Sequence, residues 1–124
     1  MESRDEILRN IPQFTGTTQW YLISPKVLLT DGTKYVAEAC GGYWLMTAIA
    51  SHIMGREKVD SFAVAKLDVA PAVVGNSAVL TLDDGNGNVF AKQDIPYTDF
   101  PLDEITLYCE WDGQRWTILL PSEH

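Results

Sequence analysis

The stretch ITLYCEWDGQRWTILL, residues 105–120, alternates apolar and polar side chains on both sides of a short turn signal. Asp112-Gly113 between two alternating runs is the strongest short-range signal for a β-hairpin. A two-residue turn there predicts three cross-strand pairs: Glu110 with Arg115, Cys109 with Trp116, and Leu107 with Ile118. The apolar members of these pairs fall on one face, so we expect a hairpin with one buried and one exposed side.

The same alternation recurs upstream, because the apolar period changes from 3.6 to 2 after residue 61. Three further runs show it: Ala63, Ala65, Leu67 and Val69; Ala78, Leu80 and Leu82; Val89, Ala91 and Ile95. The segment DDGNGN, residues 83–88, has the composition of a turn between the second and third runs. Successive hairpins of this kind predict an antiparallel β-meander.

Residues 1–61 instead predict helices and one small hairpin. Ser3 and Glu6 fit a capping box, so a short helix should cover about residues 3–10 and end near Pro12. QWYLI and KVLLT, separated by Ser24-Pro25, favour a hairpin. Thr30 or Asp31 can cap a second helix, which Gly41-Gly42 should end.

A third helix, residues 43–54, is apolar on nearly every side, with Met46, Ile49, Ala50 and Ile53 at helical spacing. Such a helix belongs at the centre of the fold, covering the apolar face of the sheet. We therefore expect a single α+β domain over residues 1–124, in which N-terminal helices and a central apolar helix pack on an antiparallel β-meander.

Charge is unevenly distributed along the chain, whose formal net charge is −8. Residues 1–61 hold seven acids and six bases, whereas residues 62–124 hold ten acids and three bases. Binding to a phosphate backbone requires clustered Lys and Arg, so no direct nucleic-acid binding is expected. An acidic face suits a basic protein partner, although acidity also serves solubility alone.

Composition points to the cytoplasm. No apolar run reaches the roughly 18 residues that span a bilayer, so no membrane association is expected. The charged start, MESRDEILRN, is the opposite of a secretory signal. Two cysteines, Cys40 and Cys109, do not make a disulfide framework, and we expect both as buried free thiols in a reducing compartment.

CGGYW, residues 40–44, resembles the cysteine-protease signature Cys-Gly-Ser/Ala-Cys-Trp/Tyr, which also begins a long buried helix. The nucleophile position of that signature is Tyr43 here, and Cys40 aligns only with the first cysteine. His52 lies about 18 Å along a regular helix from Cys40, too far for activation. No catalytic residue is assigned, and Cys40 is interpreted as a small apolar residue at a helix contact.

Two acidic segments invite metal or acid–base hypotheses. DDGNGN spaces Asp84, Asn86 and Asn88 like an EF-hand loop, but Val89 and Ile95 stand where the motif needs Gly and Glu. YTDFPLDEI gathers carboxylates around Phe100-Pro101, without a histidine to complete a catalytic set. This ordered loop is the predicted interaction surface, composed of Asp94, Asp99, Phe100, Asp103 and Glu104.

No cofactor or metal site is expected. The chain has no glycine-rich phosphate loop, no CxxC pair and no histidine cluster. Its four tryptophans could form an aromatic binding surface, but the alternation places Trp111 and Trp116 on the buried face, so we interpret them as core residues.

Several stretches together resemble one family: FTGT, LLTDGTKYVAEACGGYWLMTAIASH, DDGNGN, YTDFPL and the C-terminal LPSEH. It comprises small uncharacterised proteins of bacteria, including cyanobacteria, and of their phages, grouped as a domain of unknown function. The resemblance covers about residues 14–124, and YTDFPL and LPSEH are its most specific parts. It implies a single-domain protein, in some cases carried on mobile elements, and assigns no catalytic residues.

We accordingly expect a non-enzymatic cytoplasmic interaction module or phage accessory factor that binds an unidentified protein, preferably a basic one. An exposed edge strand also leaves a homo-oligomer open. The alternative hypothesis is a papain-like cysteine hydrolase, or its inactive descendant, centred on Cys40 or Cys109.

Overall fold

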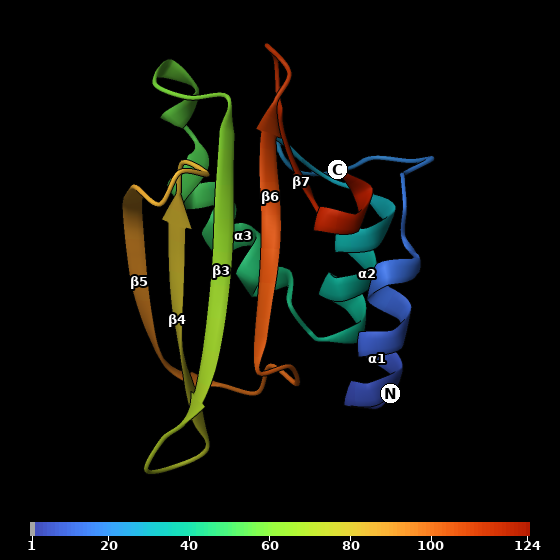
Figure 1. Cartoon of the computed structure of the whole chain (residues 1–124), viewed down its shortest axis with the longest axis vertical. Helices are drawn as coiled ribbons and strands as arrows, with labels where there is room; N and C mark the ends of the chain where they lie inside the picture. Colours follow the sequence, from blue (N-terminus) through green and yellow to red (C-terminus); the bar gives the residue numbers. More distant parts are fainter. Residues whose placement is uncertain (1) are drawn as a thin grey trace.

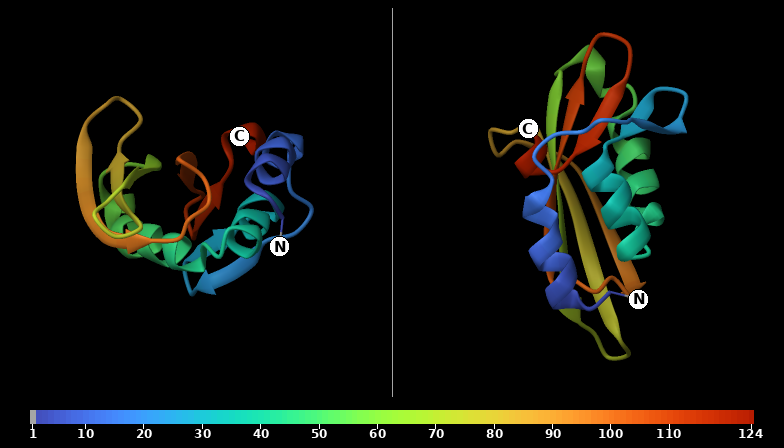
Figure 2. Two further views of the ribbon diagram at one scale, coloured as in Figure 1. Left: turned by 90° about the horizontal axis from the view of Figure 1, so that it is seen from below. Right: turned by 90° about the vertical axis from the view of Figure 1, so that its right-hand side faces the viewer.

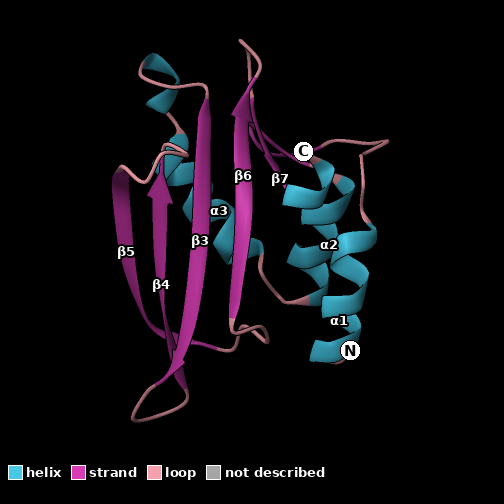
Figure 3. Cartoon of the chain, in the orientation of Figure 1, coloured by secondary structure: helices cyan, strands magenta, loops and turns pink. Residues whose placement is uncertain are grey.

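A computed structural model describes residues 2–124 (Figure 1). In this range the chain forms three α-helices and one seven-stranded sheet, which confirms the predicted α+β class (Figure 3). The helices are α1 (Arg4–Asn10), α2 (Asp31–Ala39) and α3 (Tyr43–Ile53). The strands are β1 (Tyr21–Ser24), β2 (Val27–Leu29), β3 (Phe62–Pro71), β4 (Asn76–Asp83), β5 (Val89–Thr98), β6 (Glu104–Trp111) and β7 (Trp116–Leu119).

The residues predicted to cap helices lie at the N-termini of α1 and α2. The Ser3 side chain accepts a hydrogen bond from the N–H of Glu6, and the Thr30 hydroxyl accepts one from the N–H of Thr33. Gly41, with φ of 61°, takes the left-handed conformation that ends α2, as glycine does at low cost. None of the three helices in the described chain is long and apolar enough to cross a bilayer.

Helices α2 and α3 lie along one face of the curved sheet (Figure 2). Five residues of α3 are buried: Leu45, Met46, Ile49, Ala50 and Ile53. They join the inward side chains of β3, β4 and β6 in one core, which confirms the central position predicted for this helix. Trp116 is fully buried in that core, Trp111 is partly buried against it, and Trp20 remains 56% exposed.

The strand order is β1-β2-β7-β6-β3-β4-β5, which differs from the predicted meander. Strands β3, β4 and β5 are consecutive hairpins, but β6 pairs with β3 instead of β5. Pro96 explains why β5 lies at the edge, since it has no N–H to offer a further strand. The crossover, residues 99–103, connects β5 to β6 past β4 and β3. This distance is about three strand spacings, or roughly 14 Å, which five extended residues can span.

The hairpin of β6 and β7 has a four-residue loop, so the predicted two-residue turn is wrong. Cys109 pairs with Ile118, and Trp111 pairs with Trp116. The Asp112 carboxylate accepts hydrogen bonds from the N–H groups of Gln114 and Arg115, each at 2.8 Å. This side chain stabilises the longer loop. The register therefore shifts by two residues, and the predicted faces are retained because the pleat repeats every two residues.

The N-terminal hairpin of β1 and β2 forms as predicted, and β2 continues the sheet by pairing in parallel with β7. Strand β7 is short, so it does not cover the whole length of β6. Helix α1 and the C-terminal turn, Pro121–Glu123, lie on the side where β7 ends (Figure 2).

Candidate functional site

Both cysteines are buried, as predicted, with residue exposures of 3% for Cys40 and 0% for Cys109. Burial raises the pKa of Cys40 to about 11, and the nearby Glu2 carboxylate adds to the effect. Burial also raises the pKa of Cys109. Because the thiolate is the nucleophile, neither sulfur is activated near neutral pH.

The histidines have partners other than sulfur. His52 Nε2 lies 2.8 Å from the amide oxygen of Gln93, which places its ring toward β5. His124 Nδ1 lies 2.8 Å from the Glu110 carboxylate, and its ring packs against Tyr108 and Phe62. Within the described residues, neither histidine hydrogen-bonds to a cysteine, and a cysteine nucleophile needs such a base for activation.

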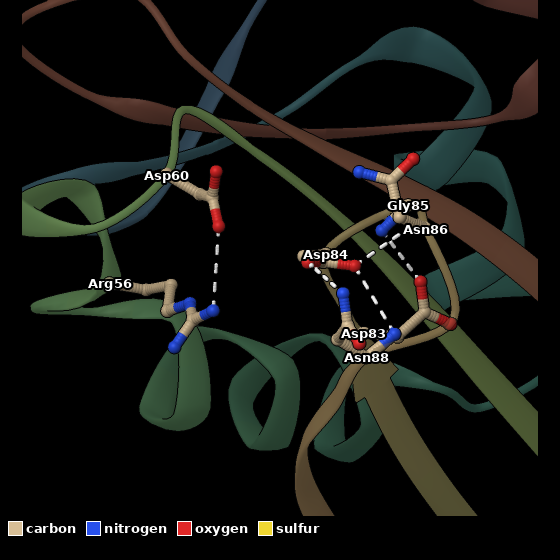
Figure 4. Close-up of polar contacts among 7 residues, drawn as sticks. All are labelled: Arg56, Asp60, Asp83, Asp84, Gly85, Asn86 and Asn88. Atoms are coloured by element: carbon tan, nitrogen blue, oxygen red, sulfur yellow. Dashed lines mark hydrogen bonds and ion pairs between the residues drawn. The ribbon is translucent and has the colours of Figure 1, made fainter.

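The DDGNGN segment is a hairpin turn whose carboxylates bind its own backbone (Figure 4). Asp83 accepts from the N–H of Gly85 at 2.7 Å, and Asp84 accepts from the N–H of Asn86 at 2.8 Å. The Asn88 side chain also donates to Asp84, which lowers the pKa of that carboxyl. No group of three or more His, Cys, Asp or Glu within residues 2–124 is arranged to hold a metal ion.

The predicted interaction residues divide into four exposed carboxylates and one core residue. Asp94, Asp99, Asp103 and Glu104 are all exposed, and Asp103 forms an ion pair with Arg4 at 2.6 Å. Phe100 is only 2% exposed and packs edge-on against Trp44, with 6.3 Å between ring centroids. Its side chain therefore anchors the crossover to the core and is not available to a partner.

Three exposed carboxylates form one row across the uncovered face of the sheet. The register places Glu104 opposite Asp68, Asp68 opposite Val79, and Val79 opposite Asp94. Like charges directly opposite one another on neighbouring strands are destabilising, so repulsion between Asp68 and Glu104 lowers the stability of the fold. The adjacent row consists of Thr106, Lys66, Thr81 and Lys92, so the carboxylates are concentrated at one end of this face and are bordered by two lysines.

Next to the acidic row, the loop between β3 and β4 presents apolar side chains to solvent. Residues 72–75, the hairpin tip, project past the end of the sheet beside the crossover (Figure 1). Val73 and Val74 are 104% and 78% exposed, and Tyr97 on β5 is 66% exposed. Gly75, with φ of 69°, closes this turn in the left-handed conformation. Clustered exposed apolar groups of this kind mark interaction sites more often than scattered ones do.

A concave surface lies between α1, α2 and β1. This groove has a volume of about 750 Å³ and is lined by carboxylates, aromatic rings and one lysine. Sequence reasoning did not identify it, because its lining residues are spread over positions 2–39 and become neighbours only when α1 packs beside α2. The hairpin tip was also missed, although PAVVG is unusual as a turn without Asn or Asp.

The two most specific family stretches have structural roles. In LPSEH, the Glu123 carboxylate accepts from the Thr30 hydroxyl at 2.6 Å, the N–H of Gly32 at 3.1 Å and the N–H of Leu120 at 2.9 Å. It thereby ties the C-terminus to the start of α2, where a negative charge is favoured. In YTDFPL, the buried residues are Thr98 at the end of β5 and Phe100 and Leu102 in the crossover.

A family model, described as a family of unknown function (DUF6876), matches residues 5–124. This match confirms the expectation of a domain-of-unknown-function family. Comparisons with curated proteins and with solved structures gave no match.

Proposed function

This chain belongs to DUF6876, a family of unknown function, and we propose that it acts as a non-enzymatic protein-interaction module. Its contact surface is the hairpin end, which we define as the hairpin tip, the exposed residues of the crossover, Asp68, Asp94, Tyr97 and Glu104. The partner is a protein with an apolar cleft bordered by Lys or Arg. The module works in the cytoplasm as an accessory factor of a phage or another mobile element, a role suggested by the resemblance to a family that includes phage proteins and, in some cases, proteins carried on mobile elements.

The exposure of Val73 and Val74 beside the acidic row carries this proposal. Val73 and Val74 are β-branched side chains exposed to water at the end of a long hairpin, and their burial in a partner would be favourable in free energy. The acidic row costs folding stability through repulsion, and basic groups across an interface would relieve that repulsion. Acidic side chains also oppose docking on anionic lipid or nucleic acid, which favours a protein as the occupant.

Pairing with a second copy is the secondary form of this proposal. Strands β1 and β5 are the two edges of the sheet. Pro96 and the exposed charges of β5 protect that edge, so β1, with Leu22 60% exposed, is the better candidate for self-pairing.

We expect the double substitution Val73→Ser/Val74→Ser to weaken binding to the native partner by at least about tenfold, because full burial of a valine side chain contributes about 1.5–3 kcal/mol. The measurement is quantitative capture from native host lysate with immobilised protein, followed by affinity measurement on the captured protein. Val59→Ser is the matched control, since Val59 is 67% exposed and lies in the connector between α3 and β3. Equal binding by the double variant and the wild type would contradict the assignment of the hairpin end.

A further inference from the structure

The groove between α1, α2 and β1 has the chemistry of a cation site, and none of its lining residues belongs to the hairpin end. Among residues 2–124, four carboxylates line it, those of Glu2, Glu6, Asp31 and Glu38, together with one cation, Lys34. The lining therefore has a formal charge of −3. An anionic ligand would be disfavoured here by like-charge repulsion.

Aromatic rings form the walls of the groove. Phe14 and Tyr35 pack with 5.2 Å between their centroids, and Tyr21 lines the side formed by β1. Aromatic faces attract cations through their quadrupole, and they attract guanidinium groups most often. Carboxylates next to ring faces thus combine the two features that bind organic cations.

Two of the carboxylates are held in place before any ligand arrives. Asp31 accepts from the N–H of Thr18 and from the Tyr21 hydroxyl, each at 2.9 Å, and these bonds lower its pKa. Glu2 accepts from the Asn10 amide at 2.9 Å and from the Tyr35 hydroxyl. A preorganised site loses less conformational freedom on binding, which favours affinity.

The chain's own lysine occupies part of this site. Lys34 Nζ lies 4.2 Å from the centroid of the Tyr21 ring and 3.7 Å from Glu38 Oε1. Lys34 makes both contacts from a half-buried side chain that is 37% exposed, and a partly exposed ion pair contributes little stability, so a stronger cation can displace it at small cost. Lys34 therefore shows which position a bound cation takes: above Tyr21 and beside Glu38.

We propose that this groove receives an arginine side chain from a basic segment of a protein partner, and that the arginine displaces Lys34 from Tyr21 and Glu38. Arginine fits better than lysine because its planar guanidinium stacks on a ring while binding a carboxylate through two N–H groups. The open groove of about 750 Å³ accommodates the flanking residues of such a segment.

The test is a titration of the full chain with the peptide acetyl-Gly-Arg-Arg-Gly-amide at low ionic strength, followed by amide chemical shifts. We expect shifts at Tyr21, Lys34 and Tyr35. Lys34→Met should bind this peptide about five to ten times more tightly, because the tethered competitor and its charge are removed. Lys58→Met is the matched control: it removes one exposed positive charge outside the groove, and its affinity should stay within about twofold of wild type.

Three results would overturn this inference. One is unchanged or weaker binding by Lys34→Met, and another is equal tightening by Lys58→Met, which would show a general charge effect. The third is absence of shifts at the groove with the arginine peptide. Equal affinity for acetyl-Gly-Lys-Lys-Gly-amide would contradict the preference for arginine. The hairpin-end proposal is tested separately by Val73→Ser/Val74→Ser, so failure here leaves that proposal standing.

Discussion

Replacement of Phe100 by Ala should reduce the free energy of unfolding by about 3–5 kcal/mol, the range for deleting a buried aromatic side chain. The ring is 2% exposed, packs against Trp44, and lies where a Cβ on Gly42 would be 3.3 Å from Phe100 Cε1. Equilibrium urea unfolding of the wild type and the variant measures the change.

Asp99→Ala is the matched control, because Asp99 is the exposed neighbour of Phe100 in the crossover. We expect this control to change the free energy of unfolding by less than about 0.5 kcal/mol. A loss below about 1 kcal/mol for Phe100→Ala would contradict the burial of the ring. It would instead support the prediction from the sequence, in which Phe100 belongs to the interaction surface.

Gly32→Ala should also be strongly destabilising, by about 3 kcal/mol, although Ala normally stabilises a helix relative to Gly. A Cβ at this position would lie 2.6 Å from Glu123 Oε1 and 2.6 Å from Leu120 Cδ1. Leu120 is fully buried and Glu123 is held by three hydrogen bonds, so neither can move without loss. Thermal or urea unfolding measures the effect.

Two control variants test whether the loss of stability in Gly32→Ala comes from its contacts with the C-terminal turn. Gly16→Ala should be neutral to within about 0.5 kcal/mol, since a Cβ there meets nothing within 4 Å. In a Glu123→Ala background, Gly32→Ala should cost less than in the wild type, because contacting residues are coupled. A stabilising Gly32→Ala substitution would show that the C-terminal turn does not pack on α2.

The buried and exposed faces of the strands could be predicted from the alternation of apolar and polar residues. This alternation is a property of each strand and does not depend on which residues it pairs with. Cys109 and Ile118 were correctly placed on the buried face even though their pairing was not, since the carboxylate of Asp112 lengthens the loop by two residues. Strand order depends on long-range packing, and the only local signal for it was Pro96, which marks an edge strand.

The candidate site was harder to predict than the fold. Asp99 and Asp103 lie in the crossover, whereas Asp94 and Glu104 lie on the polar face of β5 and β6, and the exposure of all four follows from the polar pattern of the sequence. The burial of Phe100 depends on space left by Gly42 and on contact with Trp44, about 60 residues earlier in the sequence. The groove is formed by residues from α1, α2 and β1, so no local sequence pattern predicts it.

The central claim is that the hairpin end contacts a protein partner, and site-specific photocrosslinking in native host cells tests it most directly. Benzoylphenylalanine would replace Val73 in one strain and Thr47, an exposed residue of α3, in the other. The account predicts one discrete crosslinked protein from position 73 and none from position 47. No adduct at position 73, or the same adducts at both positions, would contradict it.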